Sequence, residues 1–152
     1  MKLRLATSAA LFCVLVPRAG GDCHCHKPEK NDTTRWGGNQ SIVIVPQQHF
    51  REVSGVVQLI DNDLAENALA EIFDKPEYLV SDKPWSQKPE QKRLRACVTS
   101  RDGKFCFRNL PDGAYELRVS FIQGVNVTHV YVVIDRKAAP TEPLRITLSL
   151  GT

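Results

Sequence analysis

No segment of the chain shows the helical period, in which apolar residues recur three and four positions apart over several turns. An all-helical domain is therefore excluded. No apolar run is long enough to cross a bilayer either, because the longest one extends only from Leu5 to Val16. This run follows Lys2 and Arg4, which is the order of regions in an export signal. We expect a signal peptide over residues 1–21, with cleavage before Asp22.

The chain also lacks the pattern of a lipoprotein. A lipid-anchored cysteine is preceded by a small residue, whereas Asp22 stands before Cys23. We therefore expect the mature protein to be secreted, periplasmic or held at the cell surface without a lipid anchor.

An excess of charge of one sign is missing from the mature chain. The signal contains three of the 20 lysine and arginine residues and none of the 17 acidic residues, so cleavage leaves 17 of each. A formal charge of zero gives no basis for binding nucleic acid or an anionic membrane. We expect neither partner, and no transmembrane segment after signal removal.

Catalytic residue patterns are absent as well. The chain has four histidines, and two of them, His49 and His129, have no nearby partner in the sequence. No Ser-His-Asp or Cys-His grouping can be assembled from sequence alone. A single histidine in a strand is usually structural or solvated, so we expect no enzymatic activity, no catalytic residue and no cofactor.

Strand periodicity is what the sequence does contain. Residues 22–51 are polar and interrupted by Pro28 and Pro46, with one apolar island at Ile42 to Val45. We interpret them as a tether that can supply one added strand. From residue 52 onward, apolar residues recur at every second position, which is the period of a β-strand. Residues 52–152 are therefore expected to form one β-domain.

Seven strands are expected in this domain. The clearest alternation runs from Tyr115 to Phe121, where apolar residues alternate with the polar residues Glu116, Arg118 and Ser120. Such a pattern favours an all-β, seven-stranded antiparallel sandwich. The expected strands are Val53 to Leu59, Ala68 to Ile72, Cys97 to Ser100, Lys104 to Arg108, Tyr115 to Phe121, Val127 to Ile134, and Leu144 to Leu150.

Turn residues separate the expected strands. Asp102 and Gly103 stand between two apolar runs, which predicts a hairpin because glycine tolerates positive φ. Gly113 marks the next turn. The carboxylates of Asp61 and Asp63 could bind calcium, but no third carboxylate and glycine follow in the usual arrangement. We interpret that segment as a turn.

One long loop is expected at residues 74–93, which contain three prolines and many charges. Tyr78 and Trp85 lie in this loop beside lysines. An exposed aromatic residue next to cations can stack on a sugar or anchor a protein partner. The alternative is that these aromatic residues cover one end of the core.

The cysteines fit an oxidising compartment. Cys13 leaves with the signal, and an even number of cysteines in an exported chain favours disulfides. Cys97 and Cys106 lie on the two arms of the predicted Asp-Gly hairpin. If both point outward they can bridge, provided that the loop length sets them opposite each other. The rival is that each pairs with Cys23 or Cys25, and the sequence does not choose among the connectivities.

The run Cys23-His24-Cys25-His26 is the most unusual local feature. Thiolate and imidazole ligands suit copper(I) and zinc(II), so these four residues are a candidate metal site. Flexible ligands are poorly preorganised, however, and oxidised thiols do not bind metal. A disulfide or a plain tether is the alternative interpretation, and a redox role is a third.

Four stretches, in this order, resemble the successive signatures of carboxypeptidase regulatory-like domains. The two most specific are the Asp-Gly-x-Phe hairpin and the Leu-Pro-x-Gly-x-Tyr-x-Leu turn and strand. Asn67 stands where the family more often has glycine. The four stretches are Val53 to Val57, Leu64 to Ala70, Thr99 to Phe107, and Leu110 to Val119.

The resemblance implies a prealbumin-like Greek-key sandwich, with the carbohydrate-binding-like fold, that docks ligands or surfaces and is not itself a peptidase. No catalytic residues transfer with it. The sequence excludes two classes of protein that share this sandwich. The chain ends without the Tyr-Arg-Gly-Ser of hydroxyisourate hydrolases, and residues 144–152 lack the Asn or Asp needed for the isopeptide bond of collagen-binding modules.

We therefore expect a noncatalytic exported binding or scaffold module, whose partner is a protein or glycan surface. One alternative is a small exported copper or zinc binder that uses the Cys-His-Cys-His run. The other is a carbohydrate-binding module that uses Trp85, although a fold alone does not define a function.

Overall fold

The computed structural model describes residues 27, 41–46, 48–76, 91–121 and 125–149, and within these ranges the chain is all-β. The expected signal peptide, most of the expected tether and most of the expected long loop fall outside this part of the chain. No described segment forms a helix that could span a membrane. The strands are β1 (Ser41–Ile44), β2 (His49–Phe50), β3 (Val53–Leu59), β4 (Leu69–Phe73), β5 (Arg93–Val98), β6 (Lys104–Phe107), β7 (Gly113–Ser120), β8 (Val127–Ile134) and β9 (Leu144–Leu148).

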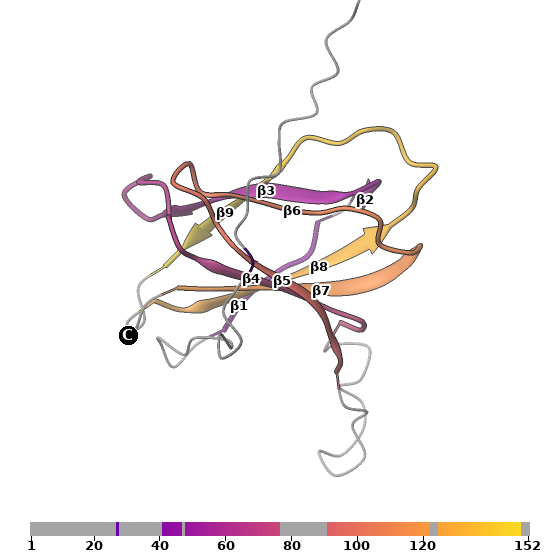
Figure 1. Ribbon diagram of the computed structural model, residues 1–152, viewed down its shortest axis with the longest axis horizontal. Helices are drawn as coiled ribbons and strands as arrows, with labels where there is room; N and C mark the ends of the chain where they lie inside the picture. Colours follow the sequence, from indigo (N-terminus) through magenta and orange to yellow (C-terminus); the bar gives the residue numbers. More distant parts are fainter. Residues whose placement is uncertain (1–26, 28–40, 47, 77–90, 122–124, 150–152) are drawn as a thin grey trace, which may run out of the picture.

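Two sheets pack face to face as a sandwich (Figure 1). The six-stranded sheet, here called the large sheet, has the order β1-β8-β7-β4-β5, with β2 also paired to β8. The three-stranded sheet, here called the small sheet, has the order β6-β3-β9. The all-β expectation is confirmed, and β3 to β9 occupy the segment in which seven strands were expected.

The expectation of a purely antiparallel sandwich is wrong, because both sheets are mixed. The apolar island of the tether forms β1, which runs parallel to β8, and β2 continues parallel to the second half of the same strand. In the small sheet, β9 lies parallel to β3. The chain crosses from β8 in the large sheet to β9 in the small one. After this crossing, β9 lies next to β3 and runs in the same direction.

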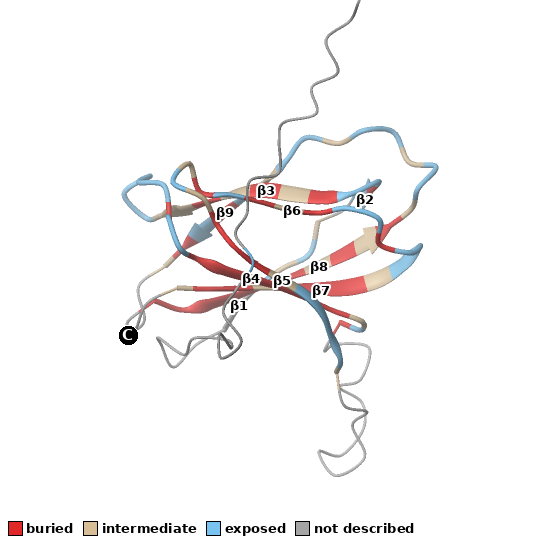
Figure 2. Ribbon diagram, viewed as in Figure 1, coloured by how far each residue is buried: buried red, intermediate tan, exposed pale blue. Residues whose placement is uncertain are grey.

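The core lies between the sheets (Figure 2). As the alternation along the strand predicted, Tyr115, Leu117 and Val119 of β7 are buried in this core. Ile146 and Leu148 of β9 lie opposite, in the small sheet. Burial of roughly twenty apolar side chains, at about 1.5–3 kcal/mol each, is the main term that offsets the ordering entropy.

The Asp-Gly segment does not connect two paired strands. Gly103 has a φ of 67°, and its amide donates to the carbonyl of Ser100 at 2.8 Å, so a turn is present. However, β5 pairs with β4 in the large sheet and β6 pairs with β3 in the small sheet. The predicted hairpin is therefore wrong, because the turn carries the chain from one sheet to the other.

Thr99 fixes the start of this crossing. Its buried hydroxyl accepts a hydrogen bond from the amide of Ala68 at 2.8 Å and donates to the carbonyl of Ala65 at 2.5 Å. The turn also packs tightly on β3, because a Cβ atom added at Gly103 would lie 2.4 Å from the carbonyl oxygen of Val57. A residue with a side chain would therefore be strained at this position.

The remaining predicted turns have their own geometry. Gly113 has a φ of 155° at the start of β7, and the Tyr115 hydroxyl donates to the carbonyl of Pro111 at 2.8 Å. Asn67 has a φ of 65°, a left-handed conformation that asparagine tolerates. In the Asp61 segment, the side chain of Asp61 accepts from the amide of Asp63 at 3.2 Å, as in an Asx turn.

Candidate functional site

Six of the residues proposed as sites from the sequence lie outside the described residues. They are Cys23, His24, Cys25 and His26 of the metal-binding hypothesis, and Tyr78 and Trp85 of the recognition hypothesis. Within the described ranges, no group of three or more His, Cys, Asp or Glu residues could hold a metal ion.

Cys97 and Cys106 are not brought together. Cys97 is buried in the core on β5, whereas Cys106 lies on β6 between Phe105 and Phe107, which both point inward. Cys106 therefore points out of the small sheet, because successive residues of a strand face opposite sides. The geometry on which the predicted bridge depended, two arms of one hairpin with both side chains outward, is not present, because β5 and β6 belong to different sheets and Cys97 faces the core. The alternation of residues within each strand could not predict this arrangement, because it does not indicate which sheet a strand joins.

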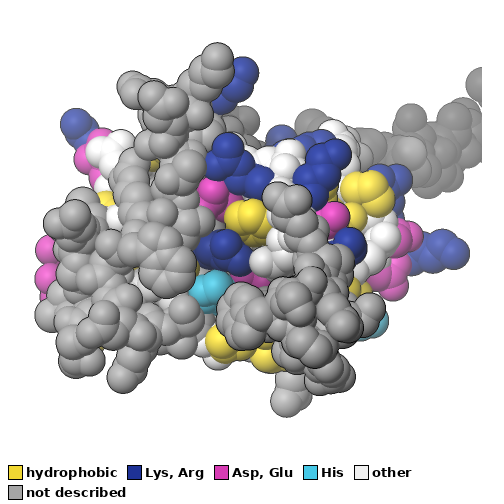
Figure 3. All heavy atoms as spheres, turned by 90° about the horizontal axis from the view of Figure 1, so that it is seen from below, with side chains coloured by type: hydrophobic (Ala, Val, Ile, Leu, Met, Phe, Trp, Pro, Cys, Tyr) yellow, Lys and Arg dark blue, Asp and Glu magenta, His cyan; other side chains and the backbone are white. Residues whose placement is uncertain are grey.

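The densest polar cluster lies on the outer face of the large sheet, which is the face turned away from the small sheet. Basic, acidic and histidine side chains gather near the middle of that face (Figure 3). Arg118 of β7 and His129 of β8 are register partners, and Glu116 lies two residues before Arg118 on the same face. We call Glu116, Arg118, His129 and Gln91 the Glu116 network.

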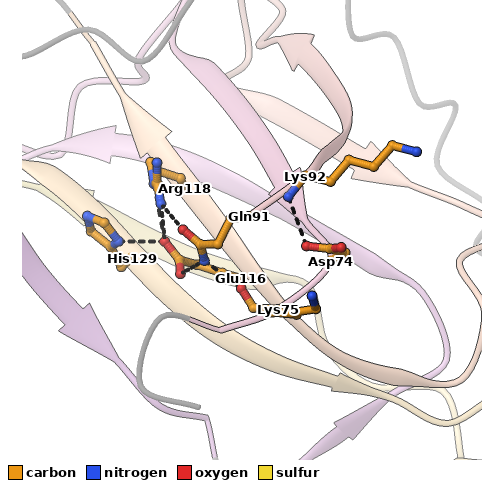
Figure 4. A network of polar contacts seen from close by, with 7 residues as sticks. All are labelled: Asp74, Lys75, Gln91, Lys92, Glu116, Arg118 and His129. Atoms are coloured by element: carbon orange, nitrogen blue, oxygen red, sulfur yellow. Dashed lines mark hydrogen bonds and ion pairs between the residues drawn. The ribbon is translucent and has the colours of Figure 1, made fainter. Parts of the chain in front are cut away.

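Glu116 is the hub of this network (Figure 4). Its Oε1 atom accepts hydrogen bonds from the Nδ1 atom of His129 at 2.7 Å and from the guanidinium of Arg118 at 2.7 Å and 3.2 Å. Its Oε2 atom accepts from the Nε2 atom of Gln91 at 2.8 Å. Both carboxylate oxygens are thus occupied in a fully buried position.

The surroundings keep this carboxyl group ionised. Burial by itself raises the pKa of Glu116, but the hydrogen bonds from His129, Arg118 and Gln91 more than offset it and lower the pKa to about 2. A carboxyl group with this pKa remains a carboxylate at neutral pH. It can therefore accept hydrogen bonds but cannot act as a general acid.

Two further contacts hold the network to its neighbours. The Arg118 guanidinium stacks over the ring of Phe73, 4.3 Å from its centroid, and also donates to the Oε1 atom of Gln91 at 3.1 Å. Gln91 donates in addition to the carbonyl of Lys75 at 2.6 Å. The two ends of the chain around the long loop, near Lys75 and near Gln91, therefore meet at this network.

A second ion pair lies beside the network. The Arg93 guanidinium of β5 donates to the Oε1 atom of Glu71 on β4 at 2.9 Å. Glu71 is buried, whereas the Arg93 side chain is 39% exposed. The outer face of the large sheet thus contains two buried carboxylates. Glu71 pairs with an arginine of the neighbouring strand β5, and Glu116 pairs with an arginine of its own strand.

His129 has one occupied and one unoccupied ring nitrogen. Because the Glu116 carboxylate can only accept, the Nδ1 atom of His129 carries the hydrogen in their contact. The Nε2 atom is buried and has no hydrogen-bond partner within the described part of the chain. A carboxylate–imidazole pair of this kind can orient a base, but catalysis needs a nucleophile or a bound substrate at Nε2. Among the described residues, no cysteine, serine or threonine is hydrogen-bonded to it.

The outer face is more buried than the sequence suggested. Alternation predicted Glu116, Arg118 and Ser120 as a polar face, and they do point away from the core, yet Glu116 and Ser120 are fully buried. Four apolar side chains are also buried without belonging to the core cluster between the sheets: Leu69, Phe73, Val98 and Val127. A strand period reports which face a residue is on, but it does not report what covers that face.

The two edges of the large sheet differ in charge. At one edge, β5 exposes Arg93, Leu94 and Arg95. At the other edge lie β1 and β2, which carry no Lys, Arg, Asp or Glu, and among the described strands they pair only with β8. Val43 in β1 is 52% exposed, and Val45 just after it is 63% exposed.

The sequence matches no protein-family model and no curated protein. The candidate sites therefore rest on geometry alone. The Glu116 network was missed in sequence because its members are distant in the chain. The pairing of β7 with β8 brings His129 to Glu116 and Arg118, and Gln91 reaches Glu116 from the segment before β5.

Proposed function

We propose that this chain is a noncatalytic, exported binding or scaffold module of the carboxypeptidase regulatory-like type, which binds an extended segment of a partner protein along β1. The observation that carries the proposal is the uncharged, apolar edge formed by β1. Unpaired edge strands normally carry charge, because a bare edge offers its backbone groups to any other strand.

The other three edge strands follow that rule. Exposed basic residues lie on each of them: Arg93 and Arg95 on β5, Lys104 on β6, and Arg145 on β9. β1 instead reads Ser-Ile-Val-Ile and is followed by Val45. An uncharged partner strand could pair with it through backbone hydrogen bonds and pack its side chains on Val43 and Val45.

The Glu116 network supports the noncatalytic part of the proposal. Both oxygens of Glu116 accept hydrogen bonds from the protein itself, and its pKa of about 2 removes it as a proton donor at neutral pH. Arg118 is likewise engaged with Glu116, Gln91 and Phe73. Except for the Nε2 atom of His129, the polar atoms named here are engaged within the protein, and polar networks of this kind stabilise structure.

Binding can be tested with a phage-displayed library of random peptides selected on the mature protein. We expect the selected peptides to be apolar and extended, and Val43→Lys to weaken their binding at least tenfold, because the lysine places a charge in the added strand. The matched control is Leu94→Lys, which changes an exposed apolar residue on the opposite edge. Failure to select peptides, or peptides that bind both variants equally, would contradict the proposal.

The noncatalytic part needs a separate test. Chromogenic peptide, ester and glycoside substrates are incubated with the mature protein and with His129→Gln. We expect no turnover above that of buffer with either protein. Turnover by the wild-type protein that disappears in His129→Gln would show that the unoccupied Nε2 atom serves catalysis, and it would overturn the proposal.

A further inference from the structure

The edge formed by β1 is open to a second molecule. Val43 is 52% exposed and Val45 is 63% exposed, whereas Ile44 between them is partly buried and packs against the core. The two valines therefore lie on the side of the chain that faces away from the core. Among the described strands, β1 pairs only with β8, so one side of its backbone has no described strand beside it.

The charges of the molecule permit this edge to pair with its own copy. Residues 41–50 contain no Lys, Arg, Asp or Glu. On the edge strands β5, β6 and β9, self-pairing would instead bring the cations of both copies into one short ladder, where like charges repel. The expected mature chain has a formal charge of zero, so no long-range repulsion keeps two copies apart.

We propose that β1 pairs antiparallel with β1 of a second copy of this chain, about a twofold axis that passes beside Ile44. A twofold dimer uses the same surface of both copies, and the axis makes the two identical strands run in opposite directions. The pair joins the two large sheets into one continuous sheet. The inference rests on the open edge of the proposed function and names a second copy as its occupant.

The position of the axis follows from the two exposed valines. With the axis beside Ile44, Val43 of each copy lies opposite Val45 of the other copy, so every one of these valines gains an apolar neighbour. Side chains directly opposite each other in an antiparallel ladder have Cβ atoms about 4.5–5.5 Å apart, which is close enough for contact. An axis beside Val43 would instead set Val45 opposite the polar Ser41 and leave more apolar surface exposed.

This dimer is closed and weak. The strand β1 has four residues, and the twofold pair occupies its open side in both copies, so the contact forms dimers and not fibres. Four residues from each copy bury less than the roughly 1,200 Å² of a small stable interface. At low concentration the edge is therefore free for a partner segment, and at high concentration the second copy covers it.

Sedimentation velocity of the mature protein tests the dimer. We expect the weight-average sedimentation coefficient to rise toward that of a dimer over roughly two decades of protein concentration, because the contact is weak. Val43→Lys should stay monomeric over the same range, and its circular dichroism should match that of wild type. Leu94→Lys, on the opposite edge, should dimerise as wild type does. The proposal is overturned if wild type stays monomeric, if Val43→Lys dimerises equally, or if the dimer survives on a denaturing gel without reductant.

Two cysteine substitutions test the register without introducing a charge. Val43→Cys and Val45→Cys, one of them isotope-labelled, are mixed and oxidised, and the tryptic peptide 36–51 contains both positions. We expect the disulfide-linked peptide pair to combine one labelled and one unlabelled copy, while each variant alone gives little product. Linked pairs of the same variant would indicate a parallel contact or a different axis, and they would overturn the proposal, as would the absence of any linked pair.

The dimer and the proposed function can fail separately. Selection of peptides that bind at β1 does not require the protein to dimerise, so a monomeric wild type that binds such peptides overturns only the dimer. A dimer with the expected cross-links that selects no peptide overturns only the binding of a partner protein.

Discussion

The two faces of β7 contain different chemistry at similar depth. Toward the small sheet, the strand presents Leu117 and Val119, which belong to the core. Toward the other side it presents Glu116 and Ser120, which are just as inaccessible to solvent. The inner face is stabilised by apolar burial, which tolerates partial loss, whereas the outer face depends on each charge keeping its partner. The comparison predicts that substitutions on the polar outer face of β7 will lower the free energy of unfolding at least as much as substitutions on its apolar inner face.

The largest effect is expected from Glu116→Ala. This change removes the shared acceptor of the half-buried Arg118 guanidinium and the buried His129 imidazole, and breaking a buried charge pair costs about 3–5 kcal/mol. We expect a loss of about 4 kcal/mol in the free energy of unfolding, measured by urea denaturation. Glu66→Ala, at an exposed position, is the control and should change stability by less than about 0.5 kcal/mol. Equal effects of the two variants would show that the network contributes nothing.

Leu117→Ala is the matching change on the inner face. Leu117 is fully buried in the core, and truncation of a buried leucine costs about 2–5 kcal/mol through lost transfer energy and the cavity that remains. We expect a loss of about 3 kcal/mol in the same urea assay, slightly below that of Glu116→Ala. A much larger loss for Leu117→Ala would mean that the apolar face dominates the stability of the sheet.

The turn between β5 and β6 shows how much of the fold the sequence could predict. Asp102 and Gly103 predicted a turn, and Gly103 has the positive φ that such a turn requires. The pairing of the two arms could not be predicted, because β5 pairs with β4 and β6 pairs with β3 through contacts distant in sequence. Turn chemistry is local, whereas sheet membership is decided by long-range pairing.

The same limit applies to the candidate site. Alternation placed Glu116 and Arg118 on the outward side of their strand, which the register of β7 with β8 bears out. No local signal indicates that His129 would lie opposite Arg118. Nor does any local signal indicate that Gln91, which follows the long loop, would donate a hydrogen bond to the Glu116 carboxylate. The added strand at Ile42 to Val45 was predicted from its composition, but its parallel direction was not.

The pH dependence of stability should distinguish the buried carboxylate from exposed ones. The pKa of Glu116 is lowered from 4.5 to about 2 in the folded protein, so its contribution is present above pH 4.5 and is lost as the pH falls toward 2. At about 1.4 kcal/mol per pKa unit, wild type should lose on the order of 2–3 kcal/mol relative to Glu116→Gln across this range. Urea denaturation of both proteins from pH 5 to pH 2 measures the difference.

Asp102 provides the control for that experiment. Its pKa is also lowered to about 2, by hydrogen bonds from Lys104 and Ser100 and by the charge of Lys104. The Asp102 side chain is 47% exposed, however, so solvent screens its interactions. The stability difference between wild type and Asp102→Asn should therefore change much less between pH 5 and pH 2. If both variants show the same dependence, burial of Glu116 is not the cause of its large contribution.

The smallest effect on stability is expected from Val43→Lys, although this change should have the largest effect on binding. Val43 is 52% exposed on an edge strand, and substitutions at such positions usually change the free energy of unfolding by no more than about 0.5 kcal/mol. Thermal and urea unfolding should therefore resemble those of wild type, while binding of the selected peptides falls. If Val43→Lys unfolds the domain instead, β1 contributes to the stability of the large sheet as β7 does, and its uncharged edge would reflect packing within the chain rather than recognition of a partner.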